Sequence, residues 1–482
     1  MLFTRSKVPE EVGIPSNAVS ELLDTLRDRC ITMHGVMLVR NGQVAAEGYW
    51  PYFNAEAPHR MYSISKSFVS LAIGCLIDEG KLRLEDQVYA FFPDKIPENL
   101  HSYIRDTTVR DLLMMATPHS EQSYTVHDPD WIWTFFNKKP SHPPGTIFSY
   151  DTAGTVVLST IVERLTGKTF LEYLYPRLLR PIGAHSMRCI CTPEGTAWGG
   201  SGVLCRLEDM ARIAYVCMHH GRWENKQLIS CEYIDAATAK QIDNSHLGNE
   251  GYGYQIWRLK HDGFGFFGMG SQFAFCFPKQ DFLFACTADT QSDPGQQTGV
   301  IECAIYKLLE QLDAVSMKKN EDYSAMQKRI STLSLPRLEG KSSSQIAEEI
   351  NGKWYSMFEN SMGISRIRFA FEESGGVMEY ENERGLKRIA FAFDGYKEGV
   401  FPEIYFGEQI GTKGTRGYRC LSTGAWVEER KLYVRCCIAD EYFGGLQIVA
   451  AFKKKEIGLN MQKVAEWFLE DYQGFAGGVR ND

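Results

Sequence analysis

The hydrophobic positions in the first three hundred residues follow both helical and strand-like spacings. Residues 17–31 carry apolar side chains at helical intervals behind Asn17, which predicts a helix with an Asn cap. Residues 35–50 form two β-rich arms around Asn41-Gly42, a strong hairpin signal. A longer apolar run begins near Ser63 and stops at Gly80, which predicts a helix that ends at glycine. Further helices are expected over 109–117, 153–167 and 207–221, strands over 251–257, 265–277 and 281–289, and a last helix ending near residue 315.

The pattern changes in the last third of the chain. Residues 317–344 are polar and interrupted by proline and glycine, which is typical of a linker. Beyond them, short segments of alternating apolar and polar residues predict an antiparallel all-β domain, either a sandwich or a barrel. Since 482 residues are too many for one core, we expect a first domain over 1–316, a linker over 317–344 and a second domain over 345–482.

The order of elements in the first domain predicts an α+β fold. The early hairpin and the late strands are expected to form one antiparallel sheet flanked by helices, while the intervening helices form a separate lobe. A candidate active site would then lie where the sheet meets the helical lobe.

Composition narrows the function classes. The 52 Lys+Arg against 60 Asp+Glu give a net charge of -8, which offers no footprint for nucleic acid or an anionic membrane. No apolar stretch reaches eighteen residues, and the N-terminal residues lack a signal-peptide core, so neither a membrane helix nor a secretory leader is expected. Several of the thirteen cysteines, such as Cys75 and Cys303, lie in apolar helical patterns, which favours buried reduced thiols over a zinc site. These features predict a cytoplasmic protein.

The candidate chemistry begins at Ser63-Ile64-Ser65-Lys66. Ser63 opens the apolar helix, whose N-terminus favours developing negative charge, and Lys66 lies one turn later on the same face. A lysine desolvated by such a helix can be neutral and can take the serine proton. The alternative is a capping serine beside an exposed lysine, and the four residues alone favour that alternative.

The surrounding segments favour a catalytic serine over a capping one. Six segments follow one another in an order that resembles the serine hydrolases of the class C β-lactamase, DD-peptidase and esterase group, especially those like nylon-oligomer hydrolase. They are the helix at Ser63, VRDLLMMAT, PGTIFSYDTAG, GGSGVLCRLEDMARIA, GYGYQIW and GMGSQFAFCFPKQDFLFACTAD. The resemblance covers most of residues 10–312. It implies a β-lactamase/transpeptidase-like domain that needs no metal or organic cofactor. The all-β region is similar to accessory domains of some relatives, from which no catalytic role carries over.

The resemblance also implies site residues. Tyr150 would shuttle protons between Ser63, Lys66 and the leaving group, and a phenol near a cationic lysine should ionise more easily. Thr152 occupies the place of the family's usual Asn or Ser. The third motif departs further, because Phe266-Phe267-Gly268 supplies no cation. Gly268 and Gly270 would let the substrate approach the backbone, and the N–H of Met269 would join that of Ser63 in an oxyanion hole.

These residues predict an acyl transfer. Ser63 would attack an amide or ester, and water would then release the acid from the acyl-enzyme. Because the third motif is apolar, small uncharged amides or esters are expected as substrates. Two alternatives remain: a catalytically weak, penicillin-binding-like ligand sensor on the same fold, and a scaffold whose β-domain binds a partner. The sequence leaves the oligomeric state open.

Overall fold

The computed structural model describes residues 3–125, 127–292, 294–312, 322–403, 417–440, 443–464 and 472–481. The chain forms two compact units, of which the first extends to Ser334 and the second begins at Leu335. This division falls inside the segment 317–344 that the sequence marks as a linker. Part of that segment, residues 317–321, lies outside the described residues, and α12 (Asp322–Ser331) belongs to the first unit.

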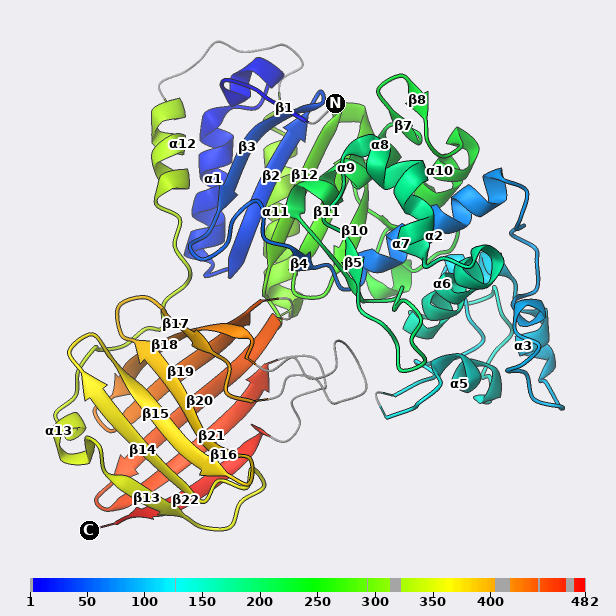
Figure 1. The fold of residues 1–482 in the computed structure, drawn as a ribbon. Helices are drawn as coiled ribbons and strands as arrows, with labels where there is room; N and C mark the ends of the chain where they lie inside the picture. The colour runs from blue at the N-terminus through cyan, green and yellow to red at the C-terminus, as the bar shows by residue number, and fades with distance from the viewer. Residues whose placement is uncertain are drawn as a thin grey trace. The chain divides into compact units, whose positions relative to one another are not determined.

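A mixed sheet forms the centre of the first unit. Its strands lie in the order β1-β3-β2-β12-β11-β10-β9, antiparallel except for β1 beside β3 (Figure 1). The bounds are β1 Thr4–Arg5, β2 Met33–Arg40, β3 Gln43–Tyr49, β9 Trp257–Arg258, β10 Phe264–Gly268, β11 Gln272–Phe277 and β12 Phe282–Ala288. The early hairpin therefore pairs with the late strands, which confirms the predicted sheet. All residues of β2 and β12 are buried, as expected for central strands covered on both faces.

Helices cover this sheet and form the adjoining lobe. Their bounds are α1 Ser16–Asp28, α2 Ile64–Asp78, α3 Ser102–Asp106, α4 Val109–Leu113, α5 Trp131–Asn137, α6 Thr152–Thr166, α7 Phe170–Leu174, α8 Arg180–Ile182, α9 Leu207–Met218, α10 Cys231–Thr238 and α11 Pro294–Leu309. α9 packs on β2, β11 and β12, whereas α2 packs against α6, α7 and α10. A Cβ at Gly74 of α2 would lie 2.4 Å from the ring of Tyr233 in α10, so glycine permits this close helix contact. α2 is therefore buried on almost every side, which explains its nearly continuous apolar sequence.

Three predicted elements differ from the structure. The segment 265–277 is two strands separated by a turn at residues 269–271, and the predicted strand over 251–257 reduces to Trp257 in β9 plus isolated bridges at Tyr252. The predicted helix over 109–117 ends as α4 at Leu113, because Met115 adopts a left-handed conformation with φ of 55°.

The second unit is a barrel of mainly antiparallel strands. A barrel is one of the two forms that the sequence predicted for it. Its order is β16-β15-β14-β13-β22-β21-β20-β19-β18-β17, and pairing of β16 with β18 through Ala392 and Thr423 closes the sheet. The bounds are α13 Ile346–Ile350, β13 Trp354–Met357, β14 Arg366–Glu372, β15 Gly375–Asn382, β16 Gly385–Ala392, β17 Lys397–Val400, β18 Arg419–Glu428, β19 Lys431–Ala439, β20 Phe443–Lys453, β21 Glu456–Val464 and β22 Gly474–Arg480. Alternate residues of β19 are buried from Leu432 onward, which matches the strand periodicity in the sequence.

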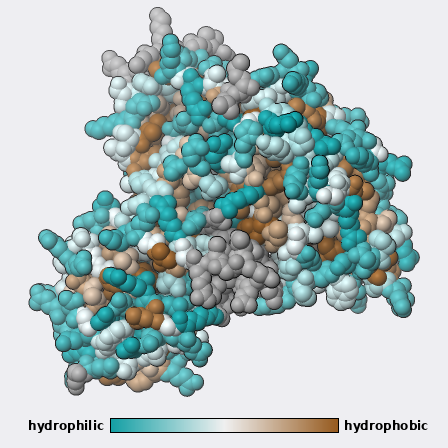
Figure 2. Space-filling view, viewed as in Figure 1, coloured by the Kyte–Doolittle hydropathy of each residue, from teal (hydrophilic) through white to brown (hydrophobic). Residues whose placement is uncertain are grey.

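The surface and the thiols agree with the composition. On the face shown in Figure 2, hydrophilic residues predominate and hydrophobic residues lie in scattered patches. Among the described residues, no helix is both long and apolar enough to cross a membrane. All thirteen cysteines are free thiols, and Cys75 is buried as predicted, but Cys303 is exposed because it lies on the outer side of α11.

Candidate active site

Ser63 lies at the junction between a short sheet and α2. β4 (His59–Arg60) pairs with β6 (Val203–Cys205), and the N–H of Met61 donates to the carbonyl of Val203 at 2.8 Å. Between them and the helix, Tyr62 is 1% exposed and has a φ of 49°, an uncommon conformation for a residue with a side chain. The chain is thus held in a tight bend immediately before Ser63.

Two buried side chains secure this bend. Ser65 Oγ donates to the carbonyl of Tyr62 at 2.6 Å and accepts from the N–H of Val203 at 3.0 Å. The guanidinium of Arg60 lies 4.6 Å from the centre of the Tyr62 ring, and its Nε donates to the carbonyl of Ser201 at 3.1 Å. Strain at Tyr62 is therefore offset by hydrogen bonds from both flanking segments.

The contacts of Ser63 and Lys66 distinguish the two interpretations of the Ser-x-x-Lys motif. Ser63 occupies the N-cap position of α2 but makes no side-chain capping hydrogen bond. Lys66 is 1% exposed, and its Nζ donates to Ser63 Oγ at 2.9 Å. The alternative of a capping serine with an exposed lysine is wrong on both counts. An amine and a hydroxyl in contact, inside an apolar helix, are arranged for proton transfer.

A glycine-rich loop holds the lysine in place. Lys66 Nζ also donates to the carbonyl of Gly200 at 2.6 Å. A Cβ at Gly200 would lie 2.4 Å from Cγ2 of Thr152, and one at Gly199 would lie 2.5 Å from Cβ of Ser159. Only glycine lets this loop pass between α2 and α6 so closely. Sequence reasoning missed this role, although the Gly199-Gly200-x-Gly202 spacing signalled a close backbone approach.

Tyr150 completes the group around Ser63. Its side chain shares a hydrogen bond with Ser63, and Lys66 Nζ lies 5.1 Å from the centre of its ring. Although the residue is 39% exposed as a whole, desolvation of the hydroxyl raises the pKa of Tyr150 to about 12, and the hydrogen bond with Ser63 opposes this only in part. The expectation that this phenol ionises easily is therefore wrong, and Tyr150 is a protonated phenol at neutral pH.

A buried carboxyl group follows Tyr150 directly. Asp151 is fully buried and caps α6 by accepting from the N–H of Ala153 at 2.9 Å, and Thr117 Oγ1 donates to its other oxygen at 3.1 Å. Burial raises the pKa of Asp151 to about 6, while these hydrogen bonds and the charge of Lys66 act in the opposite direction. Sequence reasoning missed this group, for which the only signal was its place beside Tyr150.

Thr152 is the first residue of α6. Its methyl group lies against Gly200, so this side of the residue supports the loop that holds Lys66. The hydrogen-bonding role expected for its hydroxyl stays a prediction.

The turn between β10 and β11 approaches the segment before Ser63. A Cβ at Gly268 would lie 2.3 Å from the carbonyl oxygen of Met61, so this strand end needs glycine to pack there. Gly270 and Ser271 follow with φ of 77° and 67°, and Gln272 Nε2 donates to the carbonyl of Met269 at 2.9 Å. The side chain of Met269 is 41% exposed. The turn is thus held close to the segment before Ser63, and the role of the Met269 N–H in an oxyanion hole stays a prediction.

Aromatic side chains extend from Tyr150 to β10. The rings of Tyr150 and Trp257 are stacked with centroids 5.6 Å apart, and the ring of Phe267 lies 5.8 Å from that of Trp257. Phe266 was expected to offer apolar contact beside them, but it is fully buried and packs edge-on against Phe68 of α2. Since strand residues alternate between faces, Phe267, which is partly exposed, lies on the opposite face of β10 from Phe266.

One group of metal-capable side chains occurs among the described residues, and it contains none of the residues above. His220, Cys231 and Asp235 are exposed, and both of the others hydrogen-bond to Asp235, with His220 Nδ1 2.5 Å from Oδ1 and Cys231 Sγ 3.2 Å from Oδ2.

Comparisons with known proteins bear on this arrangement. A family model described as Beta-lactamase matches residues 32–299. The chain is 25% identical over 258 residues to the 6-aminohexanoate-dimer hydrolase of Paenarthrobacter ureafaciens, covering 48% of this chain and 64% of that protein. It is also 25% identical over 163 residues to Protein flp of Staphylococcus aureus, covering 30% of this chain and 32% of that protein. The chain thus spans less than two thirds of these relatives.

Solved structures show the same fold at lower sequence identity. The octameric penicillin-binding protein homologue from Pyrococcus abyssi matches 96% of this chain and 99% of its own, with a TM-score of 0.51 and 16% identity. A penicillin-binding protein homologue from Caulobacter crescentus matches 61% of this chain and 97% of its own, with a TM-score of 0.51 and 17% identity. At such identities these likenesses concern the fold alone.

Proposed function

The chain belongs to the β-lactamase family, and on that premise we propose that it is a serine hydrolase that cleaves a small amide or ester through an acyl-enzyme on Ser63. The observation that carries the proposal is the contact of 2.9 Å between Ser63 Oγ and the buried amine of Lys66. A relative named as a 6-aminohexanoate-dimer hydrolase supports hydrolysis as the reaction class.

In the proposed mechanism, Lys66 is the base. Once the amine has released its extra proton, it accepts the proton of Ser63 Oγ across their contact while Oγ attacks the substrate carbonyl. The hydrogen bond to Gly200 holds the amine in position, so little reorganisation is needed. Buried among the apolar residues of α2, the amine is kept from water that would otherwise favour its charged form.

Tyr150 acts as the proton donor. Since its pKa of about 12 keeps the phenol protonated at neutral pH, it gives its proton to the leaving nitrogen or oxygen as the tetrahedral intermediate collapses. The ammonium of Lys66 then returns a proton to Tyr150. A water molecule releases the acid by the same steps in reverse, with its proton passing to the relay and Ser63 Oγ regaining one.

The negative charge of the tetrahedral intermediate would be met by backbone N–H groups. The N–H of Ser63 at the start of α2 and that of Met269 in the β10–β11 turn are the proposed donors. The close packing of Gly268 on Met61 and the hydrogen bond from Gln272 to Met269 support a turn held firmly enough for this task.

The aromatic residues beside Tyr150 favour uncharged substrates. Phe267 and Trp257 offer apolar surface and no positive charge to a substrate carboxylate. Desolvating an unpaired carboxylate there costs about 2 kcal/mol or more, which corresponds to a rate loss of roughly thirtyfold or greater. Neutral esters and amides should therefore react faster than β-lactams, which carry a carboxylate.

A direct comparison of substrates tests this proposal. We expect kcat/KM for a short-chain nitrophenyl ester to exceed that for a chromogenic cephalosporin by about thirtyfold or more, with Ser63→Ala as the blank. A cephalosporin rate equal to the ester rate would contradict the substrate preference. An acyl-enzyme that forms from both substrates and never turns over would instead support the ligand-sensor alternative.

A further inference from the structure

Three side chains that carry metal-binding atoms meet beside the start of α10, outside the group around Ser63. They are the imidazole of His220, the thiol of Cys231 and the carboxylate of Asp235, and their ligand atoms all lie within 4.8 Å of one another. Asp235 lies between the other two, because one of its oxygens contacts His220 Nδ1 and the other accepts from the Cys231 thiol. All three residues are exposed, so the three groups converge on one small volume that solvent can reach.

The spacing of residues in α10 places two of these groups. Cys231 is the first residue of the helix and Asp235 lies four residues later, so both side chains lie on one face. The start of the helix is held by Ser230, whose hydroxyl accepts from the N–H of Tyr233 at 3.3 Å and whose own N–H donates to a carboxylate oxygen of Asp78 at 2.8 Å. The helix itself therefore fixes the thiol and the carboxylate relative to each other.

A hairpin separates His220 from Cys231 in the chain. Its strands are β7 (Arg222–Trp223) and β8 (Lys226–Gln227). At the base of the hairpin, Gln227 Nε2 donates to the carbonyls of His220 and Ile229, both at 2.6 Å. A Cβ at Gly221, where φ is 80°, would lie 2.2 Å from the carbonyl oxygen of Ile229, so the two segments need glycine to come this close. These contacts hold His220 beside the start of α10.

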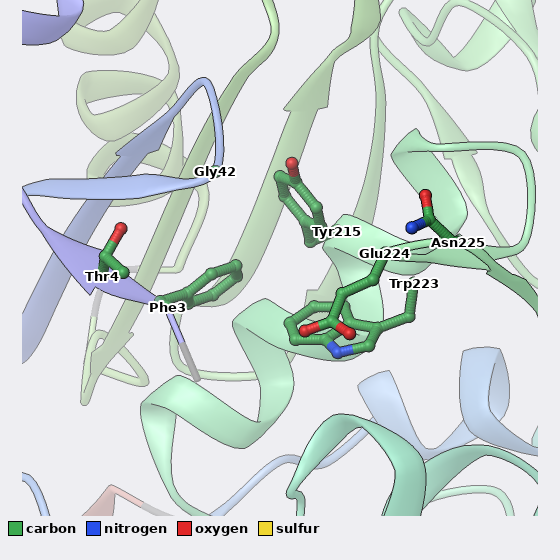
Figure 3. A pocket seen from close by; sticks show the side chains of 7 residues that line it. All are labelled: Phe3, Thr4, Gly42, Tyr215, Trp223, Glu224 and Asn225. Atoms are coloured by element: carbon green, nitrogen blue, oxygen red, sulfur yellow. The ribbon is translucent and has the colours of Figure 1, made fainter. Parts of the chain in front are cut away.

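The burial of Trp223 fixes the hairpin to the body of the first unit. This residue is 6% exposed, and its ring lies 5.8 Å from that of Tyr215 and 5.7 Å from that of Phe3 (Figure 3). The ring of Tyr215 stacks on that of His219, the residue before His220, with centroids 3.9 Å apart. The backbone is thus held on both sides of His220. Ligands that are already ordered lose less conformational entropy when an ion binds.

The types of ligand atom favour zinc. Imidazole nitrogen and thiolate sulfur are preferred ligands of Zn²⁺, whereas Mg²⁺ and Ca²⁺ prefer sets of oxygen atoms. Zn–N and Zn–O bonds of about 2.0 Å and a Zn–S bond of about 2.3 Å separate the ligand atoms of a tetrahedral site by about 3.3–3.6 Å. The contact of 2.5 Å between His220 and Asp235 and that of 3.2 Å between Cys231 and Asp235 would lengthen by less than about 1 Å to reach this geometry.

We propose that His220, Cys231 and Asp235 form a binding site for Zn²⁺ that is separate from the active site. The ion takes Nδ1 of the imidazole, the thiolate sulfur and one carboxylate oxygen, and a water molecule completes the tetrahedron. The hydrogen bond to Asp235 raises the pKa of the Cys231 thiol, so the sulfur carries a proton before the ion arrives. Formation of the Zn–S bond releases this proton to water, and binding therefore weakens as the pH falls.

A titration with Co²⁺ tests this site, because Co²⁺ accepts the same ligands as Zn²⁺ and a cobalt–thiolate bond gives a charge-transfer band in the near ultraviolet. The full chain is kept reduced and titrated with Co²⁺, and Zn²⁺ is then added. We expect one Co²⁺ per chain with a thiolate band, which Zn²⁺ abolishes. The band should be absent from Cys231→Ser and present in Cys303→Ser, which changes another exposed thiol on a helix.

Variants of the other two ligands distinguish the site from a thiol that binds metal alone. His220→Asn and Asp235→Asn should each weaken Co²⁺ binding about tenfold or more, whereas Glu232→Gln, an exposed change on the same helix, should leave it within about twofold. Zn²⁺ should also raise the urea midpoint of the parent but not that of Cys231→Ser. The proposal is overturned if the parent shows no thiolate band, if the band survives in Cys231→Ser, or if either asparagine variant binds Co²⁺ as tightly as the parent.

Discussion

The two units of this protein differ in where their charged residues lie. In the first unit, Lys66, Asp151 and Arg60 are fully buried and contact specific neighbours around Ser63. In the barrel, charged residues lie mainly on the outer surface and pair across strands. Such pairs include Arg366 with Glu381, Arg368 with Glu379 and Arg419 with Glu398.

One charged residue of the barrel, Glu403, is buried. Glu403 is 3% exposed, but it accepts hydrogen bonds from Tyr380 and Asn382, both at 2.9 Å, and lies 3.6 Å from the amine of Lys387. Its partners are other residues of the barrel wall, with no nucleophile among them. Burying ionisable groups costs free energy, but the first unit also buries Glu10, Asp209 and Arg212 away from Ser63. The contact of a buried amine with a serine hydroxyl, and not burial alone, is therefore what indicates function.

The largest expected effect is the loss of kcat in Ser63→Ala, which a second serine of the same helix, Ser67, should not share. Ser63→Ala should lower kcat by about 10³-fold or more and change the free energy of unfolding by no more than about 0.5 kcal/mol, since Ser63 is the proposed nucleophile and its side chain makes no capping hydrogen bond. Ser67→Ala is the matched control. It removes a buried hydrogen bond of 2.7 Å to the carbonyl of Gln255, so it should cost about 1 kcal/mol of stability and leave kcat within about twofold. Steady-state kinetics and urea unfolding measure both, and a reversed pattern would contradict the assignment.

The proton relay predicts non-additive losses. Lys66→Ala and Tyr150→Phe should each lower kcat by about 10²- to 10⁴-fold with smaller changes in KM, because both groups move the same protons. The double variant should lose much less than the product of the two single losses. If the losses multiply, Lys66 and Tyr150 act independently and the relay is the wrong mechanism.

Asp151 should make stability depend on pH. Because its pKa rises to about 6 on folding, the folded chain keeps a proton that the unfolded chain has already released. Stability from this group therefore falls as the pH rises from about 4 to about 6, and the loss is complete above that range. Asp151→Asn should be more stable than the parent at pH 8 by about 1–3 kcal/mol, with the difference shrinking toward pH 4. Urea midpoints at both values measure it, with Asp28→Asn, an exposed change, as the control that should show no such trend.

The smallest effects are expected in the barrel. Glu381→Gln breaks a surface pair with Arg366 and should change stability by less than about 1 kcal/mol, with kcat unchanged. A chain that ends at Ser334 should likewise fold and keep its ester hydrolysis, because α12 packs on α1 and Arg329 pairs with Asp24 at 3.0 Å within the first unit. Loss of kcat in either protein would show that the barrel takes part in the chemistry, and its charged residues would then have more than a structural role.

The sequence predicted most of the architecture where hydrophobic spacing is regular. Both domains, the sheet that joins the early hairpin to the late strands, and the alternating strands of the barrel followed from periods of two and 3.6 residues. The short elements were harder to predict. The turn at Met269 and the end of α4 at Leu113 depend on left-handed residues other than glycine, such as Ser271 and Met115, and these are held by tertiary contacts that local sequence does not encode.

The Ser-x-x-Lys motif and the PGTIFSY segment predicted Ser63, Lys66 and Tyr150 as site residues, and the structure brings these three side chains together. The sequence did not predict the electrostatics around them. The raised pKa of Tyr150, the burial of Asp151 and the carbonyl of Gly200 on Lys66 all arise from how α2, α6 and the Gly199–Gly202 loop pack together. Such packing is a property of the folded chain, because the residues that create it are far apart in sequence.

The central claim is that Ser63 is the nucleophile, and covalent labelling tests it most directly. The full chain is treated with a fluorophosphonate, and the adduct is located by peptide mass spectrometry, with Lys66→Ala and heat-unfolded protein as controls. We predict one adduct per chain, on Ser63, formed much more slowly in Lys66→Ala and absent from the unfolded protein. An adduct on another residue of the folded chain, or labelling of Ser63 at the same rate without Lys66, would contradict the account.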